Sequence, residues 1–361
     1  MDKLFPYIKR IIWLHRFSNK KLSCVRRPTH SMRTLCTGTV SNAAVDPGPS
    51  TDNLHLIRTA DDYRHNVIFP AVISAIEQLS PTVKLFRLKV PVGVEYDFES
   101  SCDSKREQRS VVTDKQCQSI RKLEYYAGQW VDVFIPELVP SIVGGFTICS
   151  APSVFAANRC LDLAVKLSSH PPAHWFHTAA CEGSRVKLRF GGDFYVTPVE
   201  VKSSESDYMF VAGGVGINPF KAIVDEILAV RKRKNGEILQ GTESQTGSRR
   251  QTLSLLYSVK SVEELLFTDA VKQWTLECKD LGIEFRYQIF VTNQGNVEGM
   301  SDAGFVAERV DLAHLKAAIA DLPLSRLKCY LCGPPPMIDS VIANLKLLDV
   351  PEARICYEKW W

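Results

Sequence analysis

Apolar and polar residues alternate over short stretches in the part of the chain that follows the N-terminal region. Residues 83–90 and 130–135 each have the alternation of a strand, and further strands are expected at 161–167 and 186–190. Glycine and proline residues separate these stretches, which is typical of an antiparallel barrel or sandwich. The polar residues 97–121 interrupt the series and are expected to form a surface insertion.

Beyond about residue 205 the pattern changes to apolar strands that alternate with helical periods. Strands are expected at 208–212, 252–257, 284–291, 328–332 and 354–357, and helices at 219–232, 262–278, 303–319 and from about 337. Strands that alternate with helices indicate a parallel sheet covered on both faces. A boundary near residue 200 therefore separates two unlike domains.

The N-terminal region is basic and has no acidic residue apart from Asp2. Residues 1–40 contain nine Lys or Arg residues, and apolar residues recur between them at helical spacing. This combination is typical of a mitochondrial transit peptide, whereas a secretory signal needs an uninterrupted apolar run. We therefore expect residues 1–40 to direct the chain to the mitochondrial matrix and residues 41–64 to form a linker. A basic amphipathic surface helix that stays attached is the alternative.

The composition narrows the range of partners. Outside the N-terminal region acidic residues slightly outnumber basic ones, so no nucleic-acid partner is expected. No stretch approaches the roughly 20 apolar residues that a membrane span requires. No coiled coil or exposed apolar helix predicts an oligomer, so we expect a monomer. The eleven cysteines do not have the complete four-ligand spacing of a zinc site or a plant-type iron–sulfur cluster, so no metal is expected.

A glycine-rich loop at 213–220 lies between an expected strand and an expected helix. Glycines let backbone N–H groups approach a diphosphate, and the start of the following helix offers unpaired donors and a partial positive charge. The predicted phosphate-binding residues are Gly213, Gly214, Val215, Gly216, Ile217, Asn218 and Pro219. The pattern G-x-G-x-x-P, without an acid at the end of the next strand, differs from a standard dinucleotide fingerprint. A tight turn without a ligand is the alternative.

A second strand-to-helix turn, at 329–337, contains three consecutive prolines. Ligands of open parallel sheets collect outside the carboxyl ends of the strands, so the two turns are expected to line one crevice. The prolines stiffen the second turn. A rigid wall suits hydride transfer, which depends on distance and orientation.

Together these two segments resemble the nicotinamide-domain motifs of the ferredoxin–NADP reductase superfamily. Residues 257–267 are similar to its second-strand segment, and 128–131 and 144–150 occupy the places of its flavin-barrel motifs. The resemblance covers about residues 65–361. It implies an antiparallel flavin-type β-barrel over 65–200, followed by a parallel-sheet α/β domain over 205–361 that binds NAD(H) or NADP(H). It also implies FAD as a second cofactor.

The resemblance also implies roles for single residues. Cys332 and Gly333 would flank the nicotinamide. Glu358 falls where related reductases carry a carboxylate near the site of hydride transfer. Trp361, backed by Trp360, would cover the isoalloxazine ring; burial of both indoles against the barrel is the alternative. The flavin contacts implied by the barrel motif are Phe146, Thr147 and Ser150.

The barrel motif departs from the family pattern at its arginine. The family runs Arg-x-Tyr-(Ser/Thr), and here Gly144, Phe146 and Thr147 occupy those positions. Losing a bidentate diphosphate partner removes a contact worth about 1.5–3 kcal/mol, or roughly ten- to a hundred-fold in affinity. Lys166, or the helix start at 168–170, is the candidate to compensate.

Other residues have plain structural interpretations that we prefer. His170, His174 and His177 have no nearby carboxylate or cysteine to complete a metal site, and Cys149 is expected to be a buried packing residue. Ser258 and Lys260 either bind the 2′-phosphate of NADPH or are ordinary strand-end residues.

The sequence thus predicts an NAD(P)H-dependent flavin oxidoreductase with an unknown electron acceptor. A nucleotide-binding regulatory or scaffold protein with a degenerate flavin site is the main alternative. A dehydrogenase without flavin would need an acid–base residue that the sequence does not reveal.

Overall fold

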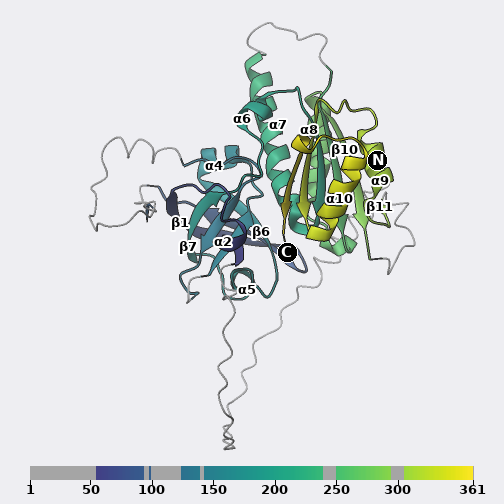
Figure 1. Ribbon diagram of the computed structural model, residues 1–361. Helices are drawn as coiled ribbons and strands as arrows, with labels where there is room; N and C mark the ends of the chain where they lie inside the picture. The colour runs from purple at the N-terminus through teal and green to yellow at the C-terminus, as the bar shows by residue number, and fades with distance from the viewer. Residues whose placement is uncertain are drawn as a thin grey trace, which may run out of the picture.

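The computed structural model describes residues 54–92, 97–98, 123–138, 142–238, 249–293 and 305–360. The chain forms two domains, a barrel of antiparallel strands and a parallel sheet between helices (Figure 1). The transit peptide expected over 1–40 and the residue Trp361 lie outside the described residues, as does most of the insertion expected over 97–121.

The first domain is a closed antiparallel barrel. Its strands are β1 (Val67–Ser80), β2 (Val83–Lys89), β3 (Asp97–Phe98), β4 (Trp130–Phe134), β5 (Val143–Thr147), β6 (Cys160–Lys166) and β7 (Arg185–Gly191). They pair in the order β5-β4-β7-β1-β2-β6, and β3 pairs with β1. A bridge between Ile148 and Leu163 joins the two ends of this order, so no long edge stays open. Three short helices accompany the barrel: α2 (Leu54–Arg58), α4 (Pro152–Asn158) and α5 (Pro171–Thr178).

The second domain contains a six-stranded sheet in which every pair is parallel. Its strands are β8 (Asp207–Gly213), β9 (Thr252–Val259), β10 (Glu284–Val291), β11 (Phe305–Val306), β12 (Leu327–Gly333) and β13 (Ile355–Lys359). Its helices are α6 (Pro198–Lys202), α7 (Asn218–Ile238), α8 (Thr268–Asp280), α9 (Leu312–Ile319) and α10 (Pro335–Leu347), with short 3₁₀ turns η2 (Gly214–Ile217), η3 (Val262–Glu264) and η4 (Glu352–Arg354). The predicted fold class, a flavin-type barrel followed by a nicotinamide-type sheet, is confirmed.

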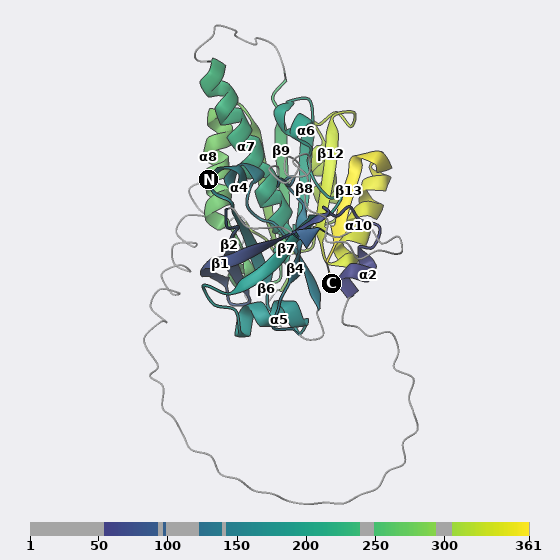
Figure 2. The same cartoon turned by 90° about the vertical axis from the view of Figure 1, so that its left-hand side faces the viewer.

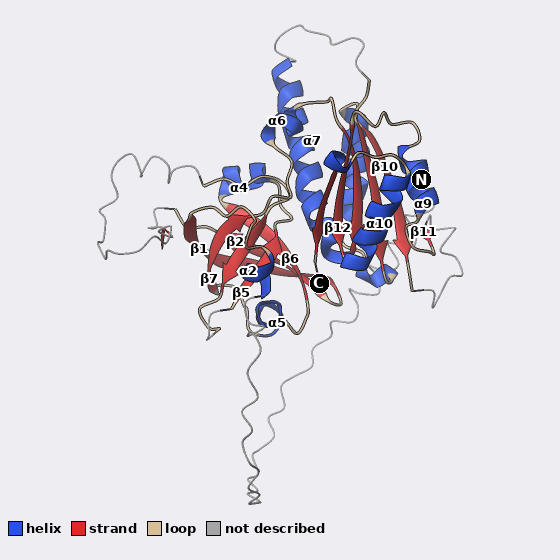
Figure 3. Ribbon diagram, viewed as in Figure 1, coloured by secondary structure: helices blue, strands red, loops and turns tan. Residues whose placement is uncertain are grey.

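Side-chain alternation along the central strand separates the two cores of the sheet. Tyr208 and Phe210 of β8 belong to the core beneath α7 and α8, whereas Met209 and Val211 belong to the core beneath α9 and α10. Successive side chains of a strand point to opposite faces, so a fully apolar strand is covered on both sides. Figure 3 shows the helices on the two faces of this sheet.

Two expected helices are shorter than the periodicity indicated. The helix expected over 262–278 is divided, because Phe267 has a left-handed backbone (φ 56°) and α8 begins only at Thr268. The helix expected over 303–319 begins at Leu312, because the Asp311 side chain accepts the His314 amide and caps the helix there. In contrast, α7 continues to Ile238, beyond the expected end at 232.

The linker expected over 41–64 is folded in its described half. Leu54–Arg58 forms α2, and Arg64 makes a bridge to Gly191 at the end of β7. The side chains of His55 and Arg64 both reach Asp132 of β4. These polar contacts fix the segment on the barrel, so it belongs to the first domain.

The two domains share one hydrophobic core. Ala164 and Cys149 of the barrel belong to the same buried cluster as Phe220 and Ile223 of α7. Polar contacts also cross between the domains, and Asn218 Nδ2 donates to the Ala164 carbonyl at 2.9 Å. The barrel is therefore packed against the strand ends of the sheet (Figure 2).

Within the described residues, no helix has the length and apolar character needed to cross a bilayer.

Candidate functional site

The strand order places a crevice at the carboxyl ends of β8 and β12. From β8 the chain proceeds to β9, β10 and β11 on one side, and β12 and β13 lie on the other side. Ligands of open parallel sheets bind where the order reverses in this way. Gly213 ends β8 and Gly333 ends β12, so the two turns predicted from the sequence do meet at one place.

The two turns pack backbone against backbone. A Cβ on Gly216 would overlap the carbonyl group of Cys332, and a Cβ on Gly213 would lie 2.7 Å from Cδ of Pro334. These glycines are therefore required for the close approach of the turns. The sequence had suggested a different reason, which was the approach of a ligand.

Gly214 is the glycine that faces open space. Its φ of +56° lies in the left-handed region, and a Cβ built on it would have no atom within 4 Å. It is the first residue of η2, which leads directly into the 21-residue helix α7. The first amides of a helix have no intrahelical partner and carry a partial positive charge, which suits a diphosphate. These residues fit the diphosphate of a nicotinamide dinucleotide.

The other predicted loop residues can take part only through the backbone. The Asn218 side chain is 4% exposed and is turned toward the barrel, where it donates to Ala164. Ile217 is fully buried and Val215 packs against the shared core. Pro219 contributes no N–H and lies within the first turn of α7. The Asn218 amide donates to the Val215 carbonyl, so both the amide and the side-chain nitrogen of Asn218 already donate within the protein.

Cys332, which was predicted to be catalytic, lies in the core shared by the two domains. Its side chain is fully buried, and burial raises the pKa of the thiol well above its usual range, so little thiolate exists. Cys329 and Cys332 have the C-x-x-C spacing of some metal and redox sites, but positions three apart in a strand point to opposite faces. The two thiols accordingly lie in different cores.

The C-terminal strand brings a carboxyl group to the same crevice. Glu358 lies opposite Cys332 in the register of β13 and β12, and the Trp360 amide donates to the Gly333 carbonyl at 3.1 Å. The Trp360 indole donates to Glu358 Oε2 at 2.9 Å. The Glu358 side chain is partly covered, and its loss of hydration raises the pKa of the carboxyl to about 8. The Trp360 hydrogen bond lowers this pKa, and the negative charge of Asp62 raises it. Glu358 is thus a group that can hold a proton at neutral pH.

Of the three predicted flavin contacts, Ser150 is used elsewhere. It is 3% exposed, its hydroxyl accepts the Asp162 amide at 3.0 Å, and its carbonyl accepts the Tyr125 hydroxyl at 2.9 Å. These bonds hold the barrel together. The Phe146 ring packs edge-on against Phe176 with centroids 5.1 Å apart, and Thr147 is buried at 7% exposure. The ring and the hydroxyl therefore lie on the barrel but present little surface to a ligand.

The barrel does not fit the diphosphate of FAD. Gly144 stands where the family carries arginine, and α5 begins with Pro171 and Pro172, which remove two backbone donors from that helix start. Lys166, considered as a substitute, lies 3.5 Å from Glu264 in an ion pair. The imidazole of His55 lies directly over Gly145. The described residues of the barrel therefore offer no charged partner for that diphosphate.

A buried ionic cluster holds α2 against the barrel, and the sequence analysis did not predict it. The carboxylate of Asp132 is fully buried and lies 2.8 Å from His55 Nε2, 3.1 Å from Arg64 Nε and 2.9 Å from Arg189 Nε. Burial alone would raise its pKa, but the His55 hydrogen bond and the charges of His55 and Arg64 outweigh burial and lower it. An acid within the apolar strand Trp130–Phe134 was the available signal, because a buried carboxylate needs partners.

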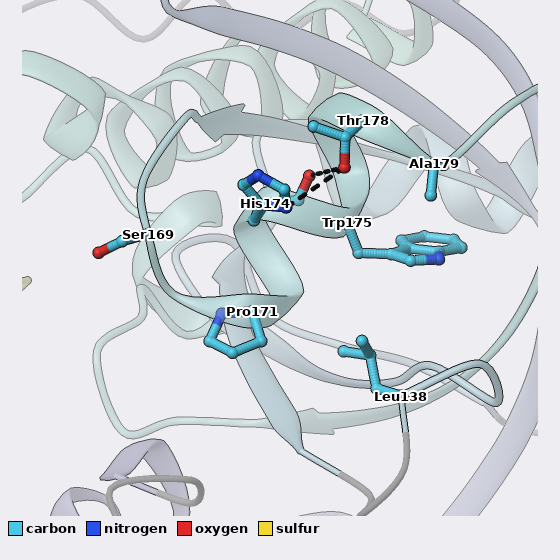
Figure 4. Close-up of a pocket in the computed structure, with 7 residues that line it drawn as sticks. All are labelled: Leu138, Ser169, Pro171, His174, Trp175, Thr178 and Ala179. Atoms are coloured by element: carbon cyan, nitrogen blue, oxygen red, sulfur yellow. Dashed lines mark hydrogen bonds between the residues drawn. The ribbon is translucent and has the colours of Figure 1, made fainter. Parts of the chain in front are cut away.

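A separate depression lies on α5, on the barrel (Figure 4). It is open, has a volume of about 420 Å³, and is lined by Leu138, Ser169, Pro171, His174, Trp175, Thr178 and Ala179. The Thr178 hydroxyl donates to the His174 carbonyl at 2.9 Å. The nearby His177 is 2.9 Å from the Val165 carbonyl. No group of three potential metal ligands occurs in the described part of the chain, and the histidines here serve local structure.

Comparisons with known proteins agree with this architecture. Residues 210–342 match the oxidoreductase NAD-binding domain family. The chain is 35% identical over 311 residues to oxidoreductase NAD-binding domain-containing protein 1 of Danio rerio, covering 85% of this chain and 97% of that one. Identity to the Xenopus laevis protein of the same name is 34% over 332 residues, covering 91% and 90%.

A solved structure of a ferredoxin NADP⁺ reductase from Neisseria gonorrhoeae, with bound FAD and NADP, has the same two-domain fold. Its TM-score is 0.54 at 18% identity, with coverage of 81% of this chain and 99% of that one. At this identity the likeness concerns the fold alone, whereas the sequence identities of about a third extend over most of the chain. The chain therefore belongs to the family of oxidoreductase NAD-binding domain-containing protein 1.

Proposed function

We propose that the chain binds NAD(H) or NADP(H) in the crevice between β8 and β12 and acts as an NAD(P)H-dependent oxidoreductase. The observation that carries this proposal is the open space over Gly214 at the start of η2, at the point where the strand order reverses. The bound dinucleotide supplies a hydride. The chain's own residues bind it, orient it and manage protons.

Each segment that lines the crevice has its own role in binding the dinucleotide or in holding a proton. The amides at the start of η2 bind the diphosphate. The Gly333–Pro334 turn forms a rigid wall for the nicotinamide, because Pro334 and Trp360 fix its backbone on either side. Glu358 holds a proton at the edge of the wall, and its raised pKa keeps that proton available near neutral pH.

The choice between NADH and NADPH depends on the end of β9. Ser258 lies beside Gly213 in the parallel register, and Lys260 is exposed just beyond it. A lysine at this position suits a 2′-phosphate, and an ordinary solvated lysine is the alternative. Titration with both coenzymes measures the preference directly.

The second candidate function is a regulatory or scaffold protein that binds the dinucleotide without passing its hydride on. The specific observation that favours it is the barrel, in which the family's arginine is absent and His55 covers Gly145. In both candidates the dinucleotide binds in the same crevice. Turnover of the reduced coenzyme distinguishes them.

The experiment is a calorimetric titration of the full chain with NADH and NADPH, followed by coenzyme consumption with an added acceptor such as ferricyanide. Gly214→Ala is the test variant, because its methyl group enters the open space that the diphosphate needs. Gly282→Ala is the matched control, since Gly282 has a similar φ of +68° and open surroundings but lies at the end of α8.

Both substitutions cost about 1–2 kcal/mol of stability through the left-handed backbone. Only Gly214→Ala is expected to weaken coenzyme binding, by roughly tenfold or more, if it removes one charge-assisted contact. Absence of heat with either coenzyme would refute the proposed function. Binding without consumption would favour the second candidate.

Import into mitochondria is a separate proposal that rests on the composition of residues 1–40. A fluorescent protein fused after residue 40 is expected to be imported. A diffuse cytosolic signal would refute the import proposal and leave the coenzyme proposal intact.

A further inference from the structure

Trp360, which follows β13, connects the groups that line one side of the crevice. Its main-chain amide donates to the Gly333 carbonyl at 3.1 Å, which joins the end of β13 to the turn after β12. Its indole donates to Glu358 Oε2 at 2.9 Å. The helix α2 lies beside this end of β13 (Figure 2), and the His55 ring is nearly parallel to the indole, at 13° with centroids 6.4 Å apart. One residue therefore links the nicotinamide wall with the proton-holding carboxyl, next to the barrel.

The indole hydrogen bond decides which oxygen of Glu358 carries the proton. Residues two apart in an extended chain point to the same side, so the side chains of Glu358 and Trp360 meet without a bend in the backbone. A protonated carboxyl group has one O–H donor and accepts through its other oxygen. Because Oε2 accepts the indole N–H, the proton is carried by Oε1.

The other titratable groups around Glu358 do not favour its ionised form. The Cys332 thiol faces it from β12, and Asp62, which follows α2, acts on it from the barrel. The neighbouring Lys359 is paired with Asp339 of α10 at 2.7 Å. Of the described groups that act on this carboxyl, the Trp360 indole is thus the one that stabilises the carboxylate.

We propose that Trp360 is a positioning residue of the crevice, and that its indole N–H holds the Glu358 carboxyl at the edge of the Gly333 turn with Oε1 left to carry the proton. Without this bond the carboxyl can change its rotamer, so the proton is no longer kept in one place. The proposal rests on the proposed function in taking Glu358 as the group that holds a proton for the reaction. The hydrogen bond itself does not depend on a coenzyme.

The experiment is a pH titration of the full chain, labelled with carbon-13 at the glutamate carboxyl groups and followed by NMR without coenzyme. Glu358→Gln identifies the Glu358 signal by its absence. Trp360→Phe is the test variant, because it keeps an aromatic ring and removes the N–H donor. Trp274→Phe is the matched control, since the Trp274 indole also donates to a carboxylate, Asp225 Oδ1 at 2.7 Å, but belongs to α8.

The pH midpoint of the Glu358 signal is expected near 8 in the unaltered chain. We expect Trp360→Phe to raise it by about one unit, or roughly tenfold in proton affinity, because the lost hydrogen bond had stabilised the carboxylate. Trp274→Phe should leave it unchanged. Consumption of reduced coenzyme with ferricyanide should fall with rising pH about one unit later in Trp360→Phe. A mere loss of packing would lower the rate at every pH without moving the midpoint.

A second measurement on the unaltered chain keeps the proposal testable if Trp360→Phe does not fold. One of the tryptophan indole N–H signals should shift with the same pH midpoint as the Glu358 carboxyl. This shift should be missing in Glu358→Gln, which has no proton to lose.

Equal Glu358 midpoints in Trp360→Phe and the unaltered chain would overturn the proposal, and so would the same rise in Trp274→Phe. A set of indole signals of which none follows the Glu358 titration would overturn it as well. Failure of the proposed function would look different, because no heat would appear with either coenzyme while the Glu358 midpoint still moved in Trp360→Phe.

Discussion

Gly216 is the residue of the nucleotide loop with the least room for a side chain. A Cβ on Gly216 would overlap the carbonyl group of Cys332, so Gly216→Ala must push the two turns apart. We expect a loss of about 1–3 kcal/mol in unfolding free energy from overpacking, together with loss of coenzyme binding. Urea unfolding and calorimetry measure the two effects.

Gly236→Ala is the control for that substitution. Gly236 is exposed within α7 and has open surroundings, so alanine should stabilise the helix by about 0.5–1 kcal/mol and leave coenzyme binding unchanged. If Gly216→Ala were as stable as the unaltered chain, the close packing of the two turns would be refuted.

Glu358 predicts a pH dependence of stability. Its pKa rises from 4.5 in the unfolded chain to about 8 in the folded chain. Between these values the folded chain keeps a proton that the unfolded chain has lost. The contribution of the protonated Glu358 to the free energy of unfolding is fully present below pH 4.5 and is lost as the pH rises through about 8.

Glu358→Gln carries no titrating proton and should not show this fall. Urea unfolding at about pH 5 and about pH 9 gives the comparison. The unaltered chain should lose more stability between the two conditions than the Gln variant does. Equal losses would mean that Glu358 titrates normally.

At the scale of elements, α2 depends on a buried carboxylate. Asp132→Asn removes the charge that His55, Arg64 and Arg189 share. Breaking a buried ion pair from one side costs about 3–5 kcal/mol, and α2 should detach, so hydrogen exchange over 54–58 should accelerate.

The exposed pair of Asp339 and Lys359, with a separation of 2.7 Å, provides the control. Asp339→Asn should cost no more than about 1 kcal/mol, because solvent screens an exposed pair. Similar costs for both substitutions would show that Asp132 is not the anchor of α2.

Elements differed in how well the sequence predicted them. Strands β8, β10 and β12 were predicted to within one residue at each end. In β8 and β12 the signal is a mostly apolar run, and in β10 it is the alternation of polar and apolar residues. The strand β5 was not predicted as a strand, since its residues include Gly144 and Gly145, and glycine disfavours strands. It forms because β4 pairs with it along its whole length.

At the scale of the whole molecule, the shared core predicts cooperative unfolding. Ala164 of the barrel and Ile223 of α7 belong to one cluster, and Glu226 of α7 accepts the Ser153 amide at 2.8 Å. Neither domain can lose its packing without exposing part of the other. We expect calorimetry and circular dichroism to give a single coincident transition.

Bound coenzyme should raise the temperature of this single transition for both domains together. A ligand at a hundred times its dissociation constant adds about 2.7 kcal/mol to the free energy of unfolding when only the folded state binds it. If the barrel and the sheet melted in two steps, of which coenzyme moved only one, the shared core would not couple them.

The candidate site was predicted in part. The sequence located the two turns at 213–220 and 329–337 and inferred that they meet, because parallel strands bring their carboxyl ends to one edge. The assignments of Ser150 to the flavin and of Cys332 to catalysis stay predictions, and both side chains are buried. Residue type and spacing do not report which face of a strand is covered.

By itself the sequence determined the local elements and the division into two unlike domains, because the period of apolar residues and the turn glycines act over a few positions. The tertiary structure alone decided how His55 is used. Its partner Asp132 is 77 positions away, and the two meet only through the strand order of the barrel. Such a contact depends on which strands become neighbours, and no local pattern in the chain specifies that.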